Sequence, residues 1–483
     1  MPLLLAISVL AAVQEEADQA LRSGNAHYAR GELDEARSAY ASCLSVAPDR
    51  TDCTTNLASV LVDLGSPEVG EQLYRRVLSA DGAHADAAYN LALLLQDHNT
   101  DEGNREAVEL YRLALSADPT RWDAWANLAA ALSDVGEEPA QAIRAFQRAI
   151  VLIEQNSAAD EAADEAHRGY LASLYFGLGN ALASLSAEQC AALAAAADTL
   201  LIGVDPTGEV VVDAHGRAAV CVDNAQNAMR MTLELEPSHV QAEHMLAALL
   251  SSGDDATLSK ASPAFVSALF DDFAASFDTK LAALRYQVPK LVGEAAAWLV
   301  EQRGKPFSAA LDAGCGTGLA GPYLRPLVTG PLVGADLAVK MLEKAANLVQ
   351  DDGARVYDAL LSKDLLSLQM ADLGRAQGVE LIVAADVLVY FGDLAEVLGA
   401  FAALASKAGC ALIFSCERVA AGTTPQGWRM LPSGRFAHTK EYVTSIASAL
   451  GFEPTAYREI IPRYEGTKPV DGHLFIFTTP GSL

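Results

Sequence analysis

A pattern that recurs about every 34 residues fills the first half of the sequence and constrains its fold more than any other feature. The segment "GNAHYARGELDEARSAYASCLSVAP" has small residues, an aromatic residue and a proline at fixed offsets. The recurring positions are Gly24, Ala36, Tyr40 and Pro48, then Ala58, Gly70, Tyr74 and Gly82, then Tyr111 and Pro119, then Phe146 and Ala149. Small residues let two helices approach and the aromatic fills the gap to the next pair, so this period predicts paired antiparallel helices.

The pattern resembles tetratricopeptide repeats, of which four units are clear, and the resemblance implies a helical solenoid over residues 15–252. A fifth unit has Gly179 in the small-residue position but is interrupted by an insertion at 186–222. Within the insertion, the turn residues at 205–208 predict a short hairpin. "SHVQAEHMLAALLSS" reads as a terminal capping helix, and "GDDATLSK" at 253–260 reads as a linker.

Charge divides the chain unevenly. Residues 1–255 hold 14 Lys and Arg against 39 Asp and Glu, a net charge of −25, whereas residues 256–483 hold 20 against 23, a net charge of −3. A nucleic-acid binder needs the opposite sign, so we expect no nucleic-acid partner. The acidity of the repeats is consistent with a solvated surface. It is also consistent with a surface that attracts a basic partner.

The cysteines and the N-terminal segment indicate the cellular compartment in which the protein works. The seven cysteines are odd in number and irregular in spacing, and no CxxC occurs, so we expect reduced thiols, a cytoplasmic location and no metal site. No apolar run is long enough to span a membrane. Residues 1–14 begin "MPLLLAISVLAAV", which reads as an apolar first helix, with a secretory signal peptide lacking a basic start as the alternative.

The second half, residues 261–483, alternates apolar strands with helical stretches. The expected strands are "SAALDAG", "PLVGAD", "ARVYD", "ELIVAADVLVY", "CALIFSCE", "PTAYREIIP" and "HLFIFTT". Seven such strands predict an α/β doubly wound, Rossmann-like sheet. The last two strands lie too close together for a crossover helix, so they should form an antiparallel hairpin at the sheet edge.

A glycine-rich turn, "LDAGCGTGLAGPYL", follows the first of these strands. It satisfies GxGxxG, which alone is a weak sign of dinucleotide binding. However, Asp312 stands at the strand end before the first glycine, where its carboxylate would repel a pyrophosphate and attract an ammonium group. The pattern D-x-G-x-G-x-G resembles motif I of class I S-adenosylmethionine-dependent methyltransferases. Cys315, between the glycines, reads as a small filler rather than a nucleophile.

The methyltransferase resemblance implies a set of cofactor contacts. They are Asp312, Gly314, Gly316 and Gly318 in the turn, Asp336 and Leu337 after the second strand, Asp364 and Leu365 in "LSKDLL", and Asp386 after the fourth strand. Asp336 offers two acceptor oxygens for the ribose hydroxyls, and Asp364 stands where the family places an acid against the adenine amino group. Helix or loop capping is the alternative role for both Asp364 and Asp386.

Asp386, Tyr390 and His438 are the candidate catalytic residues, with Asp386 facing the methyl-transfer site and His438 a candidate general base. A structural role is the alternative for His438. Arg435 and Arg463 are further pocket candidates; Arg435 could orient a carboxylate or form a surface salt bridge. Tyr286 and Arg285 could also line the pocket. The stripe Phe270, Phe273 and Phe277 reads as a helix that covers the cofactor, or as core.

The whole chain is similar to bacterial-type predicted methyltransferases that carry tetratricopeptide repeats, with the insertion at 186–222 as a departure. The expected function is transfer of a methyl group from S-adenosylmethionine, without a metal, to an acceptor that the sequence does not reveal. The repeats would recruit a protein or peptide partner. The alternatives are a catalytically inactive interaction scaffold with a cofactor-binding domain, and a nucleotide-dependent oxidoreductase.

Overall fold

The computed structural model describes residues 2–98, 100–136, 138–157, 161–195, 201, 218–251, 258–374, 377–465 and 468–482. These residues fall into two compact units, one ending at Glu236 and the other beginning at Pro237. We call them the repeat unit and the α/β unit. In the described part of the chain, no helix has both the length and the apolar character needed to cross a membrane.

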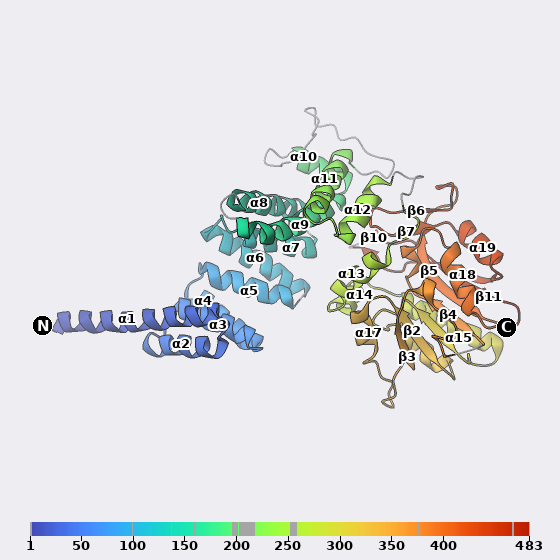
Figure 1. The fold of residues 1–483 in the computed structure, drawn as a ribbon, viewed down its shortest axis with the longest axis horizontal. Helices are drawn as coiled ribbons and strands as arrows, with labels where there is room; N and C mark the ends of the chain where they lie inside the picture. The colour runs from blue at the N-terminus through green and yellow to red at the C-terminus, as the bar shows by residue number, and fades with distance from the viewer. Residues whose placement is uncertain are drawn as a thin grey trace. The chain divides into compact units, whose positions relative to one another are not determined.

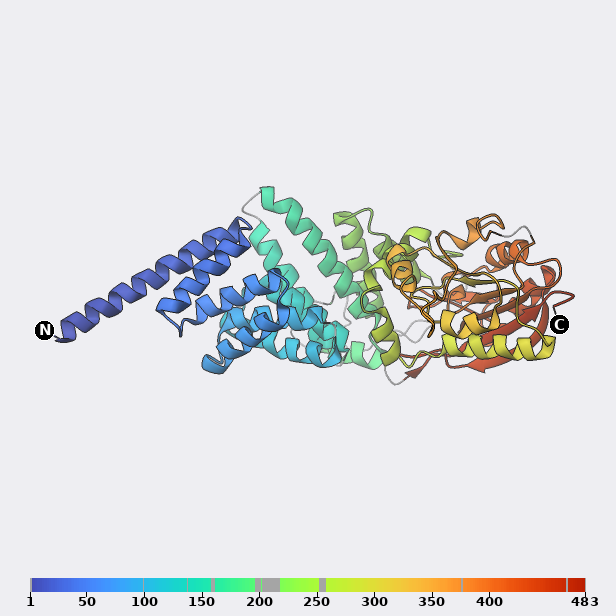
Figure 2. The same ribbon diagram turned by 90° about the horizontal axis from the view of Figure 1, so that it is seen from below.

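The repeat unit is a series of packed helical hairpins (Figure 1 and Figure 2). Its helices are α1 (Pro2–Ala29), α2 (Leu33–Val46), α3 (Thr51–Asp63), α4 (Pro67–Ala80), α5 (Ala85–Asp97), α6 (Asp101–Ala117), α7 (Trp122–Val135), α8 (Pro139–Ser157), α9 (Glu161–Ala183), α10 (Ala187–Ala195) and α11 (Ala219–Leu235). Thr100 begins α6 by accepting a hydrogen bond from the Gly103 backbone, and Pro67 occupies the first turn of α4. The predicted helical-repeat half is confirmed.

The recurring small and aromatic residues lie where the helices of a hairpin meet. A Cβ atom on Gly24 would lie within 2.4 Å of the Tyr40 ring, and one on Gly70 within 2.4 Å of Val62 Cγ2. A Cβ on Gly179 would lie 2.7 Å from Met229, so this glycine lets α9 pack against α11. Even a methyl group at these positions would therefore push the helices apart.

The predicted fifth repeat and the capping helix after it match the structure only in part. Its second helix resumes as α11, as expected, whereas the predicted hairpin at 205–208 lies outside the described residues. The predicted capping helix is α12 (Val240–Leu250), and it groups with the α/β unit. Ala248 of α12 packs in one cluster with Met430 and Phe436, which places the division between units before α12 rather than at 253–260.

The expectation of reduced thiols is wrong for four of the seven cysteines. Cys43 is disulfide-bonded to Cys53 across α2 and α3, with Cα atoms 6.4 Å apart, and Cys190 to Cys221 across α10 and α11, with Cα atoms 6.2 Å apart. Helix packing unites these pairs, and irregular sequence spacing could not reveal it. Disulfides persist in oxidising compartments, so the cysteines no longer support a cytosol-like location.

The α/β unit is built on one mixed sheet. Its strands are β1 (Ala310–Ala313), β2 (Leu332–Asp336), β3 (Ala359–Ser362), β4 (Leu381–Ala384), β5 (Ala411–Arg418), β6 (Trp428–Met430), β7 (Phe436–His438), β8 (Glu453–Ile460) and β11 (Gly472–Thr478). The main order is β3-β2-β1-β4-β5-β11-β8, with β11 antiparallel to both neighbours and β1 to β5 parallel. β7 pairs with the end of β5, and β6 with β7.

The predicted doubly wound sheet and its antiparallel C-terminal hairpin are confirmed, with one strand displaced. β3 is "ALLS" rather than the expected "ARVYD", whose Val356 and Tyr357 instead pack against the sheet. Consecutive residues on each strand serve opposite faces, as Ile413 and Phe414 do, and each face has its own core. β9 (Tyr464–Glu465) and β10 (Lys468–Pro469) form a separate short ribbon.

Helices cover both faces of the sheet. They are α13 (Pro263–Phe273), α14 (Phe277–Ala283), α15 (Val288–Arg303), α16 (Gly321–Leu324), α17 (Val339–Ala345), α18 (Ala395–Leu404) and α19 (Lys440–Ala449), with the short 3-10 turns η1 (Arg325–Leu327), η2 (Leu365–Ser367) and η3 (Leu388–Tyr390). Asp312 of β1 lies opposite Gly334 of β2 and Val383 of β4, so the carboxyl ends of these strands meet at one edge. Ligands bind at this edge in open parallel sheets.

Candidate functional site

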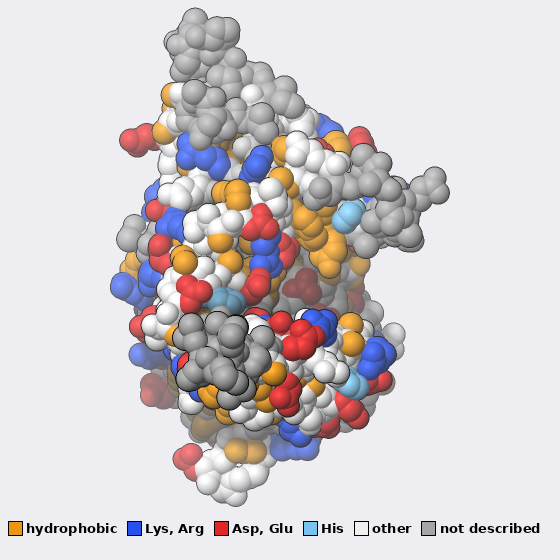
Figure 3. Space-filling model, turned by 90° about the vertical axis from the view of Figure 1, so that its left-hand side faces the viewer, with side chains coloured by type: hydrophobic (Ala, Val, Ile, Leu, Met, Phe, Trp, Pro, Cys, Tyr) orange, Lys and Arg blue, Asp and Glu red, His pale blue; other side chains and the backbone are white. Residues whose placement is uncertain are grey.

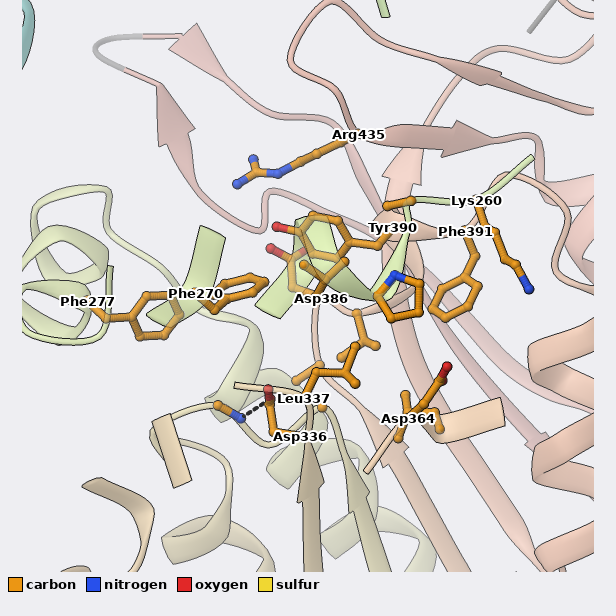
Figure 4. A pocket seen from close by; sticks show the side chains of 18 of the residues that line it. Lys260, Phe270, Phe277, Asp336, Leu337, Asp364, Asp386, Tyr390, Phe391 and Arg435 are labelled. Carbon is orange, nitrogen blue, oxygen red and sulfur yellow. Dashed lines mark hydrogen bonds between the residues drawn. The ribbon is translucent and has the colours of Figure 1, made fainter. Parts of the chain in front are cut away.

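A pocket lies at the carboxyl ends of β1, β2 and β4 and is covered by α13 and α14 (Figure 4). All of its lining residues belong to the α/β unit, and they include most of the predicted site residues. The lining residues are Lys260, Ala261, Pro263, Val266, Phe270, Phe277, Leu281, Leu284, Tyr286, Gly314, Gly316, Asp336, Leu337, Asp364, Leu365, Leu366, Ala385, Asp386, Val387, Tyr390, Phe391, Arg435 and Arg463.

The glycine turn leaves space at one wall of the pocket. Gly314, Gly316 and Gly318 all have positive φ, at 70°, 55° and 89°, which favours glycine. A Cβ on Gly314 would lie 2.4 Å from Val387, and one on Gly318 would lie 2.6 Å from Leu348. A Cβ on Gly316 would meet only Phe277, at 3.9 Å, so the backbone here faces open pocket. The turn therefore forms a cradle that a ligand can approach closely.

Asp336 ends β2 and is fixed by the same turn. Its Oδ2 accepts a hydrogen bond from the Gly316 backbone at 2.8 Å, and its Oδ1 accepts one from the Ala338 backbone at 2.9 Å. Burial raises the pKa of Asp336, while those backbone N–H groups oppose the rise. Each carboxylate oxygen has two lone pairs, so both can still accept from a ligand hydroxyl. This arrangement fits the predicted ribose contact.

Asp312 is buried behind the pocket wall rather than on it. Its Oδ2 accepts a hydrogen bond from the Tyr357 hydroxyl at 2.6 Å. Its Oδ1 is buried and has no hydrogen-bond partner in the described part of the chain. Burial raises the pKa of Asp312 to about 6, although the bond from Tyr357 opposes the rise. The predicted contact of Asp312 with an ammonium group stays a prediction, and the partnerless oxygen is compatible with it.

Asp364 and Leu365 both reach the pocket. Asp364 also caps η2, because its carboxylate accepts a hydrogen bond from the Leu366 backbone at 2.9 Å. The two roles that the sequence left open for this residue are therefore compatible. Leu337, next to Asp336, adds apolar surface to the same end of the pocket (Figure 4).

Asp386 lies at the other end, just beyond β4, in a strained conformation. Its φ is 60°, which is uncommon for a residue with a side chain, and its backbone N–H donates to Ser415 Oγ at 2.8 Å. Its Oδ2 accepts from Arg463 at 3.1 Å, and its Oδ1 is buried without a partner among the described residues. Burial raises the pKa of Asp386, against the positive charge of Arg435.

Two arginines accompany Asp386 and Tyr390. Arg463 is almost fully buried and donates to Glu417 at 2.5 Å as well as to Asp386. Arg435 donates to the Tyr390 hydroxyl and lies 3.6 Å from the same Glu417 oxygen. Glu417 was missed in the sequence. Its signal was an acid at the carboxyl end of a buried strand, which is unusual unless the acid is paired.

His438 is not part of the pocket lining, so the general-base prediction is corrected to a structural role. The ring is fully buried, and its Nε2 lies 2.8 Å from the Phe391 carbonyl oxygen and 3.1 Å from that of Gly392. Burial lowers the pKa of His438 to about 4. A neutral ring that donates to two carbonyls holds the chain after η3 in place.

The aromatic stripe is split by the break between α13 and α14. Phe270 and Phe277 line the pocket, and Phe270 packs edge-on against Tyr390 with ring centroids 5.5 Å apart. Phe273 ends α13, is 39% exposed and does not line the pocket, so the three side chains do not share one face. Tyr286 lines the pocket, whereas Arg285 does not. Thr317 of the glycine turn donates to Asp278 of α14 at 2.6 Å, which ties the cover to the turn.

A protein-family model matches part of the chain that forms this pocket. Residues 311–411 match the model described as a methyltransferase domain, from β1 to the first residue of β5. The α/β unit carries a methyltransferase domain. The matched range contains the glycine turn, Asp336, Asp364 and Asp386. The pocket residues Arg435 and Arg463 lie outside it.

Solved structures also resemble parts of the chain at low identity. Magnesium protoporphyrin IX methyltransferase (ChlM) from Synechocystis PCC 6803 with bound SAH is 19% identical, covering 45% of this chain and 99% of its own, with a TM-score of 0.35. PilF of Pseudomonas aeruginosa is 17% identical, covering 56% and 93%, with a TM-score of 0.34. YrrB, a TPR protein described as having an unusual peptide-binding site, is 14% identical, covering 49% and 95%, with a TM-score of 0.33. No curated protein matches the sequence.

Proposed function

We propose that the methyltransferase domain binds S-adenosylmethionine and transfers its methyl group to an acceptor in the same pocket. The observation that carries the proposal is the open glycine cradle at Gly316, fixed to Asp336 at the carboxyl end of β2. This combination fits a nucleoside whose ribose hydroxyls donate to a carboxylate. The cofactor supplies a methyl group that its sulfonium charge has already activated.

The residues divide between the two ends of the pocket. Gly314 and Gly316 line the pocket and give the cofactor close access to the backbone, Gly318 packs behind them against Leu348, and Asp336 accepts from the ribose. Asp364, with Leu337 and Leu365, lies at the end that would hold the adenine. Burial under α13 and α14 excludes water and orients the reactants, and orientation of this kind can supply roughly 7–11 kcal/mol.

Asp386 and Tyr390 belong to the acceptor end. Arg463 holds one oxygen of Asp386, and the partnerless Oδ1 can accept a proton that the acceptor loses. Its pKa is raised by burial, which brings a carboxyl group nearer to the range in which a general base is effective. Tyr390 has a pKa raised by burial, so it acts as a hydrogen-bonding wall rather than as a base.

The repeat unit is proposed to recruit a protein or peptide partner, with a basic segment favoured by charge. Figure 3 shows acidic and basic side chains interspersed on the face that it displays. Part of the acid is already paired, since Arg50 contacts Asp18 and Asp52. The surplus is nonetheless large, because residues 1–236 hold 14 Lys and Arg against 36 Asp and Glu, a net charge of −22. Partner capture should therefore weaken as salt rises.

Calorimetric titration of the full chain with S-adenosylmethionine, its demethylated product and NAD tests the cofactor. We expect the first two to bind and NAD not to bind. Asp336→Ala should weaken binding by about a hundredfold, because it removes two hydrogen bonds to a charged acceptor. Asp351→Ala, which removes an exposed acid of the same domain, is the matched control. Binding of NAD alone would overturn the proposal.

Transfer is tested separately from binding. The full chain and labelled cofactor are incubated with fractions of a cell extract, and Asp386→Asn serves as the comparison. We expect transfer that falls at least a hundredfold in Asp386→Asn while cofactor affinity stays within threefold. Cofactor binding without transfer to any fraction would favour the interaction scaffold.

A further inference from the structure

The acceptor end of the pocket differs in charge from the cofactor end. Two of the three lining carboxylates, Asp336 and Asp364, belong to the cofactor end. The acceptor end has one, Asp386, together with the guanidinium groups of Arg435 and Arg463. Lys260, the remaining lining cation, is ion-paired with Glu396 at 2.7 Å. The lining of the acceptor end therefore carries two guanidinium groups and one carboxylate, and Glu417, buried behind the lining, supplies a second negative charge.

The two arginines have different tasks. Arg463 is 2% exposed and bridges Asp386 and Glu417 at 3.1 Å and 2.5 Å, so it fixes the carboxylates. The Arg435 side chain is 29% exposed and lies 3.6 Å from Glu417. At that distance the two groups form an ion pair, and the Arg435 guanidinium also donates to the Tyr390 hydroxyl. Figure 4 shows the Arg435 guanidinium extending over the pocket on the same side as Tyr390 and Asp386.

The backbone that carries Arg435 is held from two sides. Leu431 N–H donates to the Arg435 carbonyl at 2.7 Å and closes the turn between β6 and β7. The Nε2 of His244 in α12 lies 2.8 Å from the Gly434 carbonyl oxygen, and the same ring stacks on Phe265 of α13 at 3.8 Å. Arg435 is therefore positioned by packed structure rather than left on a free loop.

Beyond Glu417, Asp386 and the Tyr390 hydroxyl, aromatic and aliphatic side chains form the wall near Arg435. Phe270 packs against Tyr390, and Val266 and Tyr286 complete the wall. A guanidinium offers five N–H donors in a planar fork that matches two oxygens of a carboxylate or phosphate. In apolar surroundings such a contact is stronger than in water.

We propose that Arg435 binds an anionic oxygen group of the methyl acceptor, a carboxylate in the simplest case, while the apolar body of the acceptor packs against Phe270 and Tyr286. The inference rests on the proposed methyltransferase function and names the class of its acceptor. Arg463 contacts both Asp386 and Glu417, and the Arg435 side chain, 29% exposed against 15% for Asp386, is the most accessible of these four charged groups. Asp386 remains beside the atom that receives the methyl group.

The test compares a charged probe with a neutral one of the same shape. Benzoate, phenyl phosphate and benzamide are titrated separately into the full chain saturated with the demethylated cofactor, and affinities are measured by ligand-observed NMR. We expect benzoate or phenyl phosphate to bind at least tenfold more tightly than benzamide. The better of the two anions identifies the group as a carboxylate or a phosphate.

Variants then assign the preference to Arg435. Arg435→Gln should lose at least tenfold in affinity for the preferred anion and leave benzamide unchanged, and Arg435→Lys should recover part of the loss. Arg458→Gln removes the same charge from an exposed position of β8 and should change nothing. Affinity for the demethylated cofactor within threefold of the parent shows that the pocket of each variant is folded.

The outcomes separate this inference from the proposed function. Equal affinity for benzoate and benzamide, or no binding by any probe while the demethylated cofactor binds, overturns the role of Arg435 alone. A preference for anions that survives in Arg435→Gln also overturns it. Failure of the parent protein to bind the demethylated cofactor contradicts the methyltransferase proposal itself.

Discussion

The two units are built on different principles. In the repeat unit, residues with one role recur along the chain, so Gly24, Gly70 and Gly179 each let a pair of helices approach. In the α/β unit, each site residue has one role, and Asp336, Asp386 and Arg435 come from distant segments. Stability in a repeat array is shared among neighbouring units, whereas a site depends on a few positions. Substitutions should therefore act differently in the two units.

A reducing agent should give the largest difference in stability change between the repeat unit and the α/β unit. The chain-entropy estimate for disulfides that close loops of 10 and 31 residues is about 3 and about 4 kcal/mol. Reduction should destabilise the repeat unit by several kcal/mol and leave the α/β unit unchanged, because the cysteines described there are free and buried. Hydrogen exchange of the full chain, read separately on peptides of each unit, measures this. Equal loss of protection in both units would refute the contrast.

Acid should act on the α/β unit through His438. Its pKa of about 4 in the folded protein lies below the ordinary value of 6.5, so the folded state binds fewer protons. The associated stability, about 3 kcal/mol, is fully present above pH 6.5 and is lost as pH falls toward 4. His438→Gln should lose less stability than the parent over this range, by roughly that amount, in urea titrations at each pH. An identical acid slope in both proteins would contradict this.

A matched pair of glycines tests packing against backbone conformation. Gly314 and Gly65 both have positive φ, but a Cβ would collide with Val387 at Gly314 and meet nothing within 4 Å at Gly65. Gly65→Ala should cost about 1 kcal/mol from conformation alone. Gly314→Ala should cost about 2–4 kcal/mol because overpacking is added, and it should weaken cofactor binding. Urea unfolding of the two variants measures both costs. Similar losses of stability would show that the glycine turn relaxes to accept the added methyl group.

The smallest expected change in stability is an increase, and it comes from replacing Asp312. Ionising Asp312 at neutral pH is unfavourable in the folded state, since its pKa is raised to about 6. Asp312→Asn removes that ionisation and should stabilise the empty domain by about 2 kcal/mol. The same change should weaken S-adenosylmethionine binding at least tenfold if the carboxylate meets the ammonium group. Thermal unfolding and calorimetry measure the two effects, and a variant that binds normally would assign Asp312 to structure only.

The difference between the units also explains what the sequence could reveal. Periodicity predicted the hairpins because each repeat must bury the same face. Residue type at strand ends predicted Asp336 and Asp386, and the resemblance to methyltransferases predicted Asp364. The position of α12 was not predictable in this way, because its apolar pattern fits either unit and only its contacts with Met430 and Phe436 decide. His438 was misplaced because a helix start does not show which way a preceding strand residue points.

Long-range pairings were missed for a related reason. Tyr357 and Glu417 acquire their roles from partners 45 and 46 residues away, Asp312 and Arg463. The two disulfides likewise join neighbouring helices through packing. Local sequence patterns carry no information on such partners, since the pairing depends on the completed fold.

The place of β11 between β5 and β8 has a consequence for biosynthesis. Helical hairpins can form one after another as the ribosome releases them, because each contacts its neighbours in sequence. The sheet cannot close in this way, because among the described strands β8 joins it only through β11, which follows β8 in the chain. A nascent chain that stalls before Gly472 would expose β5 and β8 as open edges that invite aggregation. The repeats would be folded by then, whereas the α/β unit would depend on chaperones until β11 emerges.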